Sequence, residues 1–187
     1  MVILVILMKK NRFDIKKFVI VNSVLIFLFG FITHNLYKWF PSIITVIFPV
    51  NESLFEHLKM IFITPIIVSL ILYVYSSTKK IKYNNYFFAL MITVISNIAI
   101  FYALFLPIYY RFGQSLIITL IIYFISIVIS QIVNAKILNN TKNNTILNIL
   151  GCIILVIILA VLVYFTYYPI MDDFFFDPTK EIYGIPK

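Results

Sequence analysis

One short stretch of this chain carries several side chains that could do chemistry. Residues 49–59 read PVNESLFEHLK and place two carboxylates, an imidazole and an ammonium group within eight positions. Long apolar runs lie on both sides of this stretch. Ionisable groups are costly at membrane depth and usually serve a purpose there. The first candidates for catalytic residues are therefore Glu52, Glu56, His57 and Lys59.

Two more distant features could join this stretch. His34 lies at the end of the preceding apolar run and is a further catalytic candidate, at the same expected depth as His57. Three consecutive phenylalanines at 174–176 predict that the C-terminal tail folds back onto the protein, which would bring Asp177 towards the histidines. Two histidines with a carboxylate could bind a divalent metal and activate water. The predicted metal ligands are thus His34, His57 and Asp177, although their spacing in the sequence matches no standard metal motif.

A structural interpretation accounts for part of the same stretch. Ser53-Leu54-Phe55-Glu56 fits a capping box, in which the hydroxyl and the carboxylate satisfy the first backbone amides of a helix. A lysine in the second turn opposes the helix dipole, so Lys59 should pair with Glu56, three residues back. This interpretation leaves Glu52 and His57 without a structural role.

The composition places these residues in a membrane protein. The chain is 63% hydrophobic and 12% charged, whereas soluble domains carry about a quarter charged residues. The net charge of +8 comes from short basic clusters between apolar runs, a pattern typical of a protein held against anionic lipid. The lipid bilayer is therefore an expected partner and nucleic acid is not. The single cysteine, Cys152, cannot form an intramolecular disulfide.

We predict an all-α integral membrane bundle of about five helices, forming a single domain over residues 1–187. A short apolar piece at 40–50 is below spanning length and should be interfacial or re-entrant. Either Met1 or Met8 could be the start of the natural protein. The predicted segments are a 1–17 N-terminal segment, spans at 18–37, 53–75, 86–106, 115–137 and 146–168, and a 169–187 tail.

The loops predict an orientation in the cell membrane. Ten of the fifteen Lys and Arg residues lie in the N-terminal segment and in the loops at 76–85 and 136–145. The positive-inside rule then puts the N-terminus in the cytoplasm and, after five crossings, the C-terminus outside. Six of the seven acidic residues and both histidines fall on the outer side. The candidate chemistry is therefore predicted at one face.

These motifs resemble a family. The pattern Pro-Val-Asn-Glu-Ser-x-aromatic-Glu-His-x-Lys at 49–59 is preceded by His-x-x-Tyr-x-Trp from His34 and followed by Phe-x-Asp-Pro and Tyr-Gly-Ile in the tail. Over residues 34–185 the chain resembles a family of small bacterial multi-pass membrane proteins catalogued as a domain of unknown function. This chain has Phe55 where the family has tryptophan, and Glu181 where it has glycine. The resemblance implies a five-helix membrane protein and brings no activity with it.

Two classes of function remain open. The first is a membrane protein that binds a ligand, takes part in transport or supports a partner, and the lack of a catalytic motif favours it. The second is an outer-leaflet enzyme, a metal-dependent hydrolase acting on a lipid or envelope substrate. There His34 and His57 would bind metal or transfer protons, with Glu52 or Asp177 as partner, and Lys59 would hold an anionic lipid head group. A small ligand at the outer face fits either class, and the oligomeric state stays open. His34, His57 and a carboxylate within metal-binding reach, in a cavity open to the outer leaflet, would favour the enzyme. A Glu56 that caps its own helix and pairs with Lys59, with the histidines pointing apart, would exclude it.

Overall fold

The computed structural model describes residues 15–78, 83–139 and 142–186. Most of the predicted N-terminal segment, including the Met1 and Met8 alternatives, lies outside the described residues. The same is true of Lys79, Lys80 and Lys82, which contributed to the predicted orientation.

Five long helices make up most of the described chain. At 23–27 residues each and about 1.5 Å per residue, they are roughly 35–40 Å long, more than the hydrocarbon thickness of a bilayer. All five are long and apolar enough to cross a membrane, and the predicted all-α class with five such helices is confirmed. They are α2 (Ile15–Trp39), α3 (Leu54–Thr78), α4 (Tyr86–Phe112), α5 (Leu116–Leu138) and α6 (Thr145–Tyr167).

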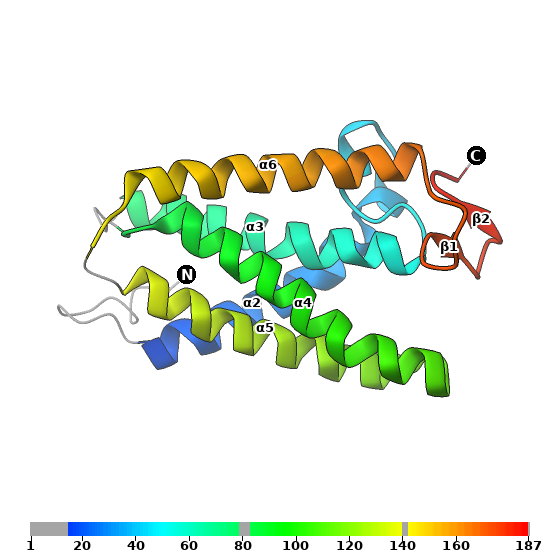
Figure 1. Ribbon diagram of the computed structural model, residues 1–187, viewed down its shortest axis with the longest axis horizontal. Coiled ribbons are helices and arrows are strands. Elements are labelled where there is room, and N and C mark those ends of the chain that lie inside the picture. The colour runs from blue at the N-terminus through cyan, green and yellow to red at the C-terminus, as the bar shows by residue number, and fades with distance from the viewer. Residues whose placement is uncertain (1–14, 79–82, 140–141, 187) are drawn as a thin grey trace.

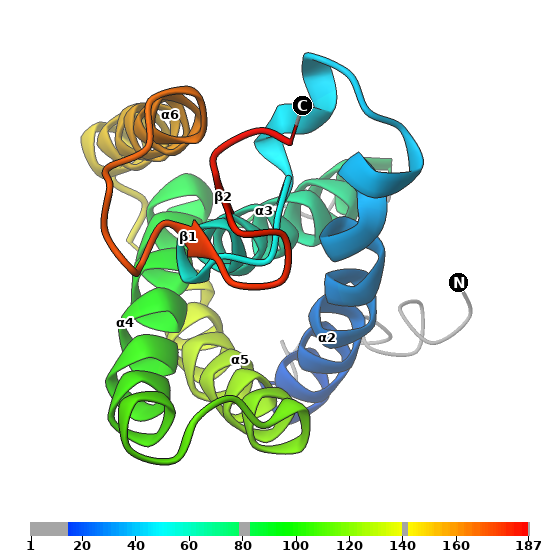
Figure 2. The same ribbon diagram turned by 90° about the vertical axis from the view of Figure 1, so that its right-hand side faces the viewer.

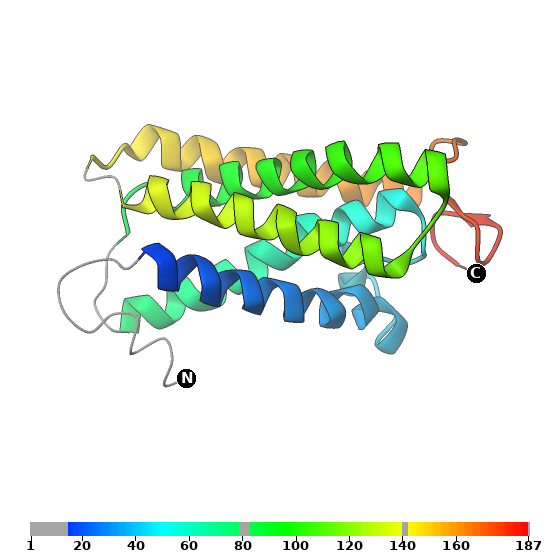
Figure 3. The ribbon, with the colours of Figure 1, turned by 90° about the horizontal axis from the view of Figure 1, so that it is seen from below.

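The helices lie side by side along one long axis (Figures 1 and 3). Helices α2, α3, α4 and α5 form a closed ring, because each contacts the next and α5 returns to α2. Helix α6 packs mainly on α4 and is the least buried of the five. The exposed faces of the helices are covered with isoleucine, leucine and valine, as expected for surfaces that face lipid.

Two glycines allow close helix contacts. A Cβ at Gly30 would lie 2.9 Å from the Tyr123 hydroxyl, so α5 approaches α2 closely there, as small residues allow between membrane helices. A Cβ at Gly151 would lie 2.7 Å from the Phe87 carbonyl oxygen. This second contact brings α6 against the first turn of α4.

The chain between α2 and α3 lies at one end of the bundle. It contains a 3-10 helix, Ile44–Ile47, in place of a spanning segment. Trp39, Phe40, Ile43 and Ile44 all expose more than half of their surface. Aromatic and aliphatic side chains in this arrangement suit the boundary between lipid and water.

The C-terminal tail folds back over the same end of the bundle. Its strands β1 (Phe176–Asp177) and β2 (Ile182–Tyr183) form a short antiparallel hairpin, which lies over the start of α3 (Figure 2). The Phe55 amide donates to the Phe174 carbonyl at 2.9 Å, and the Asn51 side chain donates to the Gly184 carbonyl at 2.7 Å. The predicted fold-back of the tail is confirmed.

Candidate functional site

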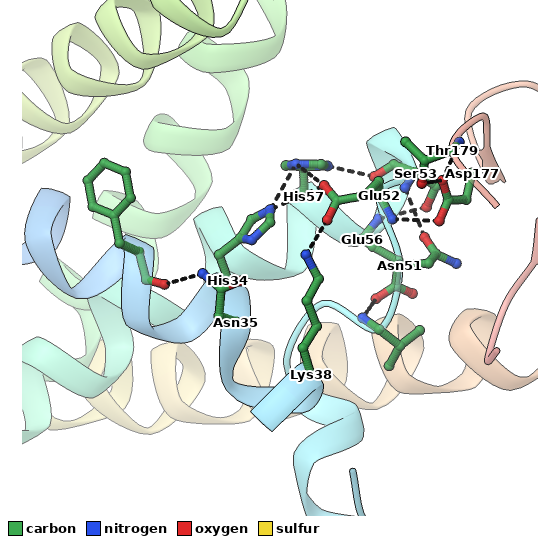
Figure 4. A network of polar contacts seen from close by, with 12 residues as sticks. His34, Asn35, Lys38, Asn51, Glu52, Ser53, Glu56, His57, Asp177 and Thr179 are labelled. Atoms are coloured by element: carbon green, nitrogen blue, oxygen red, sulfur yellow. Dashed lines mark hydrogen bonds and ion pairs between the residues drawn. The ribbon is translucent and has the colours of Figure 1, made fainter. Parts of the chain in front are cut away.

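Four polar side chains converge where α2 ends and α3 begins (Figure 4). His34 and Lys38 lie four residues apart in the last turns of α2 and so share a face. His57 lies in the first turn of α3, and Glu52 lies in the loop just before that helix. The chain reverses between α2 and α3, and this reversal brings groups from all three segments together.

The distances define a compact group. The Nε2 atoms of His34 and His57 are 3.3 Å apart. Glu52 Oε2 lies 3.4 Å from His34 Nε2 and 3.6 Å from His57 Nε2. The other carboxylate oxygen, Oε1, accepts a hydrogen bond from Lys38 Nζ at 2.5 Å. We call His34, Glu52 and His57 the histidine–glutamate group; it is the set of potential metal ligands found within the described residues.

A hydrogen bond to the backbone fixes the orientation of the His57 ring. Its Nδ1 lies 2.8 Å from the Ser53 carbonyl oxygen, an atom that can only accept, so Nδ1 carries the proton. The Nε2 atom of the neutral ring then carries a lone pair, which can accept a hydrogen bond from His34 Nε2 at 3.3 Å. Metal-binding histidines are commonly oriented in this way, by a backbone carbonyl that binds the second ring nitrogen.

Glu52 is held in its charged form. The hydrogen bond from His34 has the largest effect on its pKa; partial burial opposes this effect, and the hydrogen bond from Lys38 adds to it. The net result is a Glu52 pKa well below the ordinary value. Because an ionised carboxylate is the form that binds a cation, this environment favours metal binding.

The three ligand atoms have the dimensions of one face of a zinc coordination tetrahedron. From the distances of 3.3, 3.4 and 3.6 Å, a point equidistant from all three atoms and about 0.7 Å out of their plane lies about 2.1 Å from each of them, which matches Zn–N and Zn–O bonds. Two imidazoles and a carboxylate are also a common ligand set for zinc. The spacing of the three atoms is therefore compatible with a divalent ion, which would replace the proton that His34 Nε2 donates to Glu52.

A small cavity lies beside Glu52 and His57. Its volume is about 30 Å³, above the roughly 10–15 Å³ that a cavity needs to hold a water molecule. Aromatic side chains of α4, including Phe101, Tyr102 and Phe105, form much of its wall. A water molecule would fit there, beside two of the three members of the histidine–glutamate group.

Asp177, which the sequence proposed as a metal ligand, lies in a different position. Its Oδ2 accepts from the Glu52 amide at 3.0 Å, and its Oδ1 accepts from the Thr179 amide and hydroxyl. Burial disfavours its charged form, but these hydrogen bonds outweigh that effect and hold the pKa of Asp177 below its usual range. Asp177 therefore positions the backbone of Glu52, and Glu52 supplies the carboxylate of the group.

Glu56 and Lys59 form a separate, buried ion pair. Lys59 Nζ lies 2.6 Å from Glu56 Oε2, and both side chains are 1% exposed. Lys59 also donates to the Val46 carbonyl at 2.7 Å and to the Thr166 hydroxyl at 2.8 Å. The predicted pairing of the two residues is confirmed. Because Lys59 is enclosed, it does not reach an anionic head group at the surface.

The predicted capping box forms only in part. The Ser53 hydroxyl accepts from the Glu56 amide at 3.2 Å, as expected. The Glu56 carboxylate instead accepts from the Val50 amide at 3.0 Å, and the Ser53 amide donates to the Asn51 side chain. The Glu56 carboxylate therefore links the loop before α3 to the buried ion pair.

Two residues that contribute to this region were not identified from the sequence. Lys38 could have been found, because it lies four residues after His34 and so shares its helical face. Thr166, on α6, donates to Glu56 Oε1 at 2.9 Å. It had no sequence signal, because its partner lies 110 positions away.

The fold and the site together define an all-α protein with five helices that could span a membrane and a histidine–glutamate group at one end of the bundle. The chain belongs to a family of unknown function, DUF6512, which it matches over residues 7–185. Comparisons with curated proteins and with solved structures give no significant match.

Proposed function

We propose that the protein is a multi-pass membrane protein that binds a divalent transition-metal ion through His34, Glu52 and His57. The observation that carries the proposal is the triangle of ligand atoms, with sides of 3.3, 3.4 and 3.6 Å. The oriented His57 ring and the charged Glu52 carboxylate support it. Zinc is the ion that this ligand set fits best.

The proposed setting is the outer face of the cell membrane. Five apolar helices support membrane insertion. The positive-inside rule, applied to the basic loops, supports an N-terminus in the cytoplasm and a C-terminus outside. An odd number of crossings then puts the histidine–glutamate group on the outer side, where the metal would exchange with the medium.

Metal analysis of the protein in detergent tests the proposal. We expect about one equivalent of zinc after incubation with zinc and removal of the excess. His34→Ala and His57→Ala should each weaken zinc binding at least about 10-fold, because each removes a ligand. Asn35→Ala is the matched control: it changes the neighbouring residue on α2, whose side chain donates to the Phe31 carbonyl of its own helix. Wild-type zinc content in both histidine variants would refute the proposal.

A metal-dependent hydrolase acting on a lipid or envelope substrate is the second candidate. It is favoured by the number of protein ligands, because catalytic zinc sites typically have three and leave the fourth position to water. The cavity beside Glu52 and His57 would hold that water. A substrate would require the cavity to widen, which movement of the tail segment Phe176–Pro178 in its wall could provide. Zinc-dependent release of a head group from outer-leaflet phospholipid, lost in His57→Ala but kept in Asn35→Ala, would establish this activity.

A further inference from the structure

We propose that the opposite end of the bundle contains a binding site for an anionic phospholipid, between the end of α5 and the starts of α4 and α6. A hollow of about 380 Å³ lies there, at the end away from the tail hairpin (Figure 1). It shares no residue with the histidine–glutamate group, so it is independent of the proposed metal site.

Hydrogen bonds hold together the segments before α4 and α6 that border the hollow. Asn85, just before α4, donates through its side chain to the Lys142 carbonyl at 2.6 Å and accepts from the Asn144 amide at 2.7 Å. Asn85 itself has a positive φ of 53°, a conformation that asparagine tolerates better than most residues. Asn148 on α6 accepts from the Phe87 amide at 3.1 Å, at the first turn of α4. These bonds fasten the two loops to each other.

The lining of the hollow combines positive charge with an apolar surface. Lys136, in the last turn of α5, and Lys142 both line the hollow and are exposed. Phe88, Ile137 and Leu147 supply its apolar part. Two ammonium groups suit a phosphate diester, and the apolar side chains suit the first carbons of the acyl chains.

The surroundings favour a lipid over a free anion. Leu147 lines the hollow, and Leu150, three residues further along the same side of α6, is 47% exposed, so an apolar face continues away from the lysines along the helix. A phospholipid with its phosphate between the lysines would lay its chains along this face. Basic pockets between membrane helices bind anionic head groups by the same combination of charge and apolar contact.

Lipid retention by the full-length protein in detergent tests this proposal. We would measure bound phosphatidylglycerol and phosphatidylcholine by native mass spectrometry, and add inorganic phosphate in a separate titration. We expect selective retention of phosphatidylglycerol. Lys136→Gln with Lys142→Gln should weaken it roughly 25-fold, since each basic residue near an anionic lipid contributes about fivefold.

The control is Lys16→Gln with Lys17→Gln, which removes two exposed charges from the same end of the bundle but outside the hollow. This variant should retain phosphatidylglycerol within about twofold of wild type, because general attraction to anionic lipid is not the proposed source of selectivity. Equal retention of the two lipids would overturn the proposal. So would equal losses in the two double variants, or competition by millimolar inorganic phosphate that removes the lipid completely.

Discussion

The buried pair of Glu56 and Lys59 gives the sharpest prediction about stability. Lys59→Met should destabilise the protein strongly, whereas Lys59→Met combined with Glu56→Gln should cost much less. The single change leaves a carboxylate buried at 1% exposure without its cation. The double change removes both charges, and glutamine can still accept the hydrogen bond from the Val50 amide.

The size of the effect follows from the contacts. Removing one partner of a buried ion pair costs about 3–5 kcal/mol, because an uncompensated charge remains in the interior. Lys59→Met also leaves the Val46 carbonyl without the donor it has at 2.7 Å, which adds about 1 kcal/mol. Removing both charges of such a pair is often close to neutral. We therefore expect about 5 kcal/mol for Lys59→Met, about 4 kcal/mol for Glu56→Gln and about 1–2 kcal/mol for the double variant.

The assay is equilibrium unfolding in mixed micelles, followed by far-ultraviolet circular dichroism on all four members of the double-mutant cycle. Lys180→Met, at an exposed tail position, is the control and should lie within about 0.5 kcal/mol of wild type. Zinc affinity of the double variant should stay within about twofold of wild type, because neither residue belongs to the histidine–glutamate group. Additive single effects below about 1 kcal/mol each would refute the reasoning.

Two further predictions concern the tail and the effect of pH. Glu181 has a φ of 54°, so Glu181→Gly should raise the free energy of unfolding by about 1 kcal/mol; Gly184→Ala should lower it, because φ is 67° and the new Cβ would lie 2.8 Å from the Thr166 carbonyl. Both effects can be measured by the same unfolding assay, and an unchanged Gly184→Ala protein would contradict the second. Folding lowers the pKa of Glu52 from its ordinary value of 4.5, so the ionised carboxylate stabilises the metal-free protein at every pH above 4.5. This stabilisation is lost as the pH falls from 4.5 through the lower pKa of the folded state. Glu52→Gln should flatten that part of the stability–pH curve, and an unchanged acid limb would rule out Glu52 as its source.

Several features could be predicted from the sequence because they depend on local order. Long apolar runs give helices that could cross a membrane, since a backbone in lipid must satisfy its own hydrogen bonds. The pairing of Glu56 with Lys59 follows from a three-residue step on a helix. The fold-back of the tail follows from three adjacent phenylalanines, which need apolar contacts. The sequence could therefore also indicate which region of the chain carries the polar candidates.

The membership of the polar group was decided only by the tertiary structure. His34 and His57 are 23 positions apart and Glu52 lies between them, so their meeting depends on how the chain turns between α2 and α3. Asp177 lies 125 positions after the amide it binds, and the hairpin delivers it to the backbone of Glu52 instead of to the histidines. Sequence periodicity fixes the face of a helix but not which faces meet. For that reason the sequence determined the candidates, and packing at the end of the bundle brought Glu52, rather than Asp177, next to the two histidines.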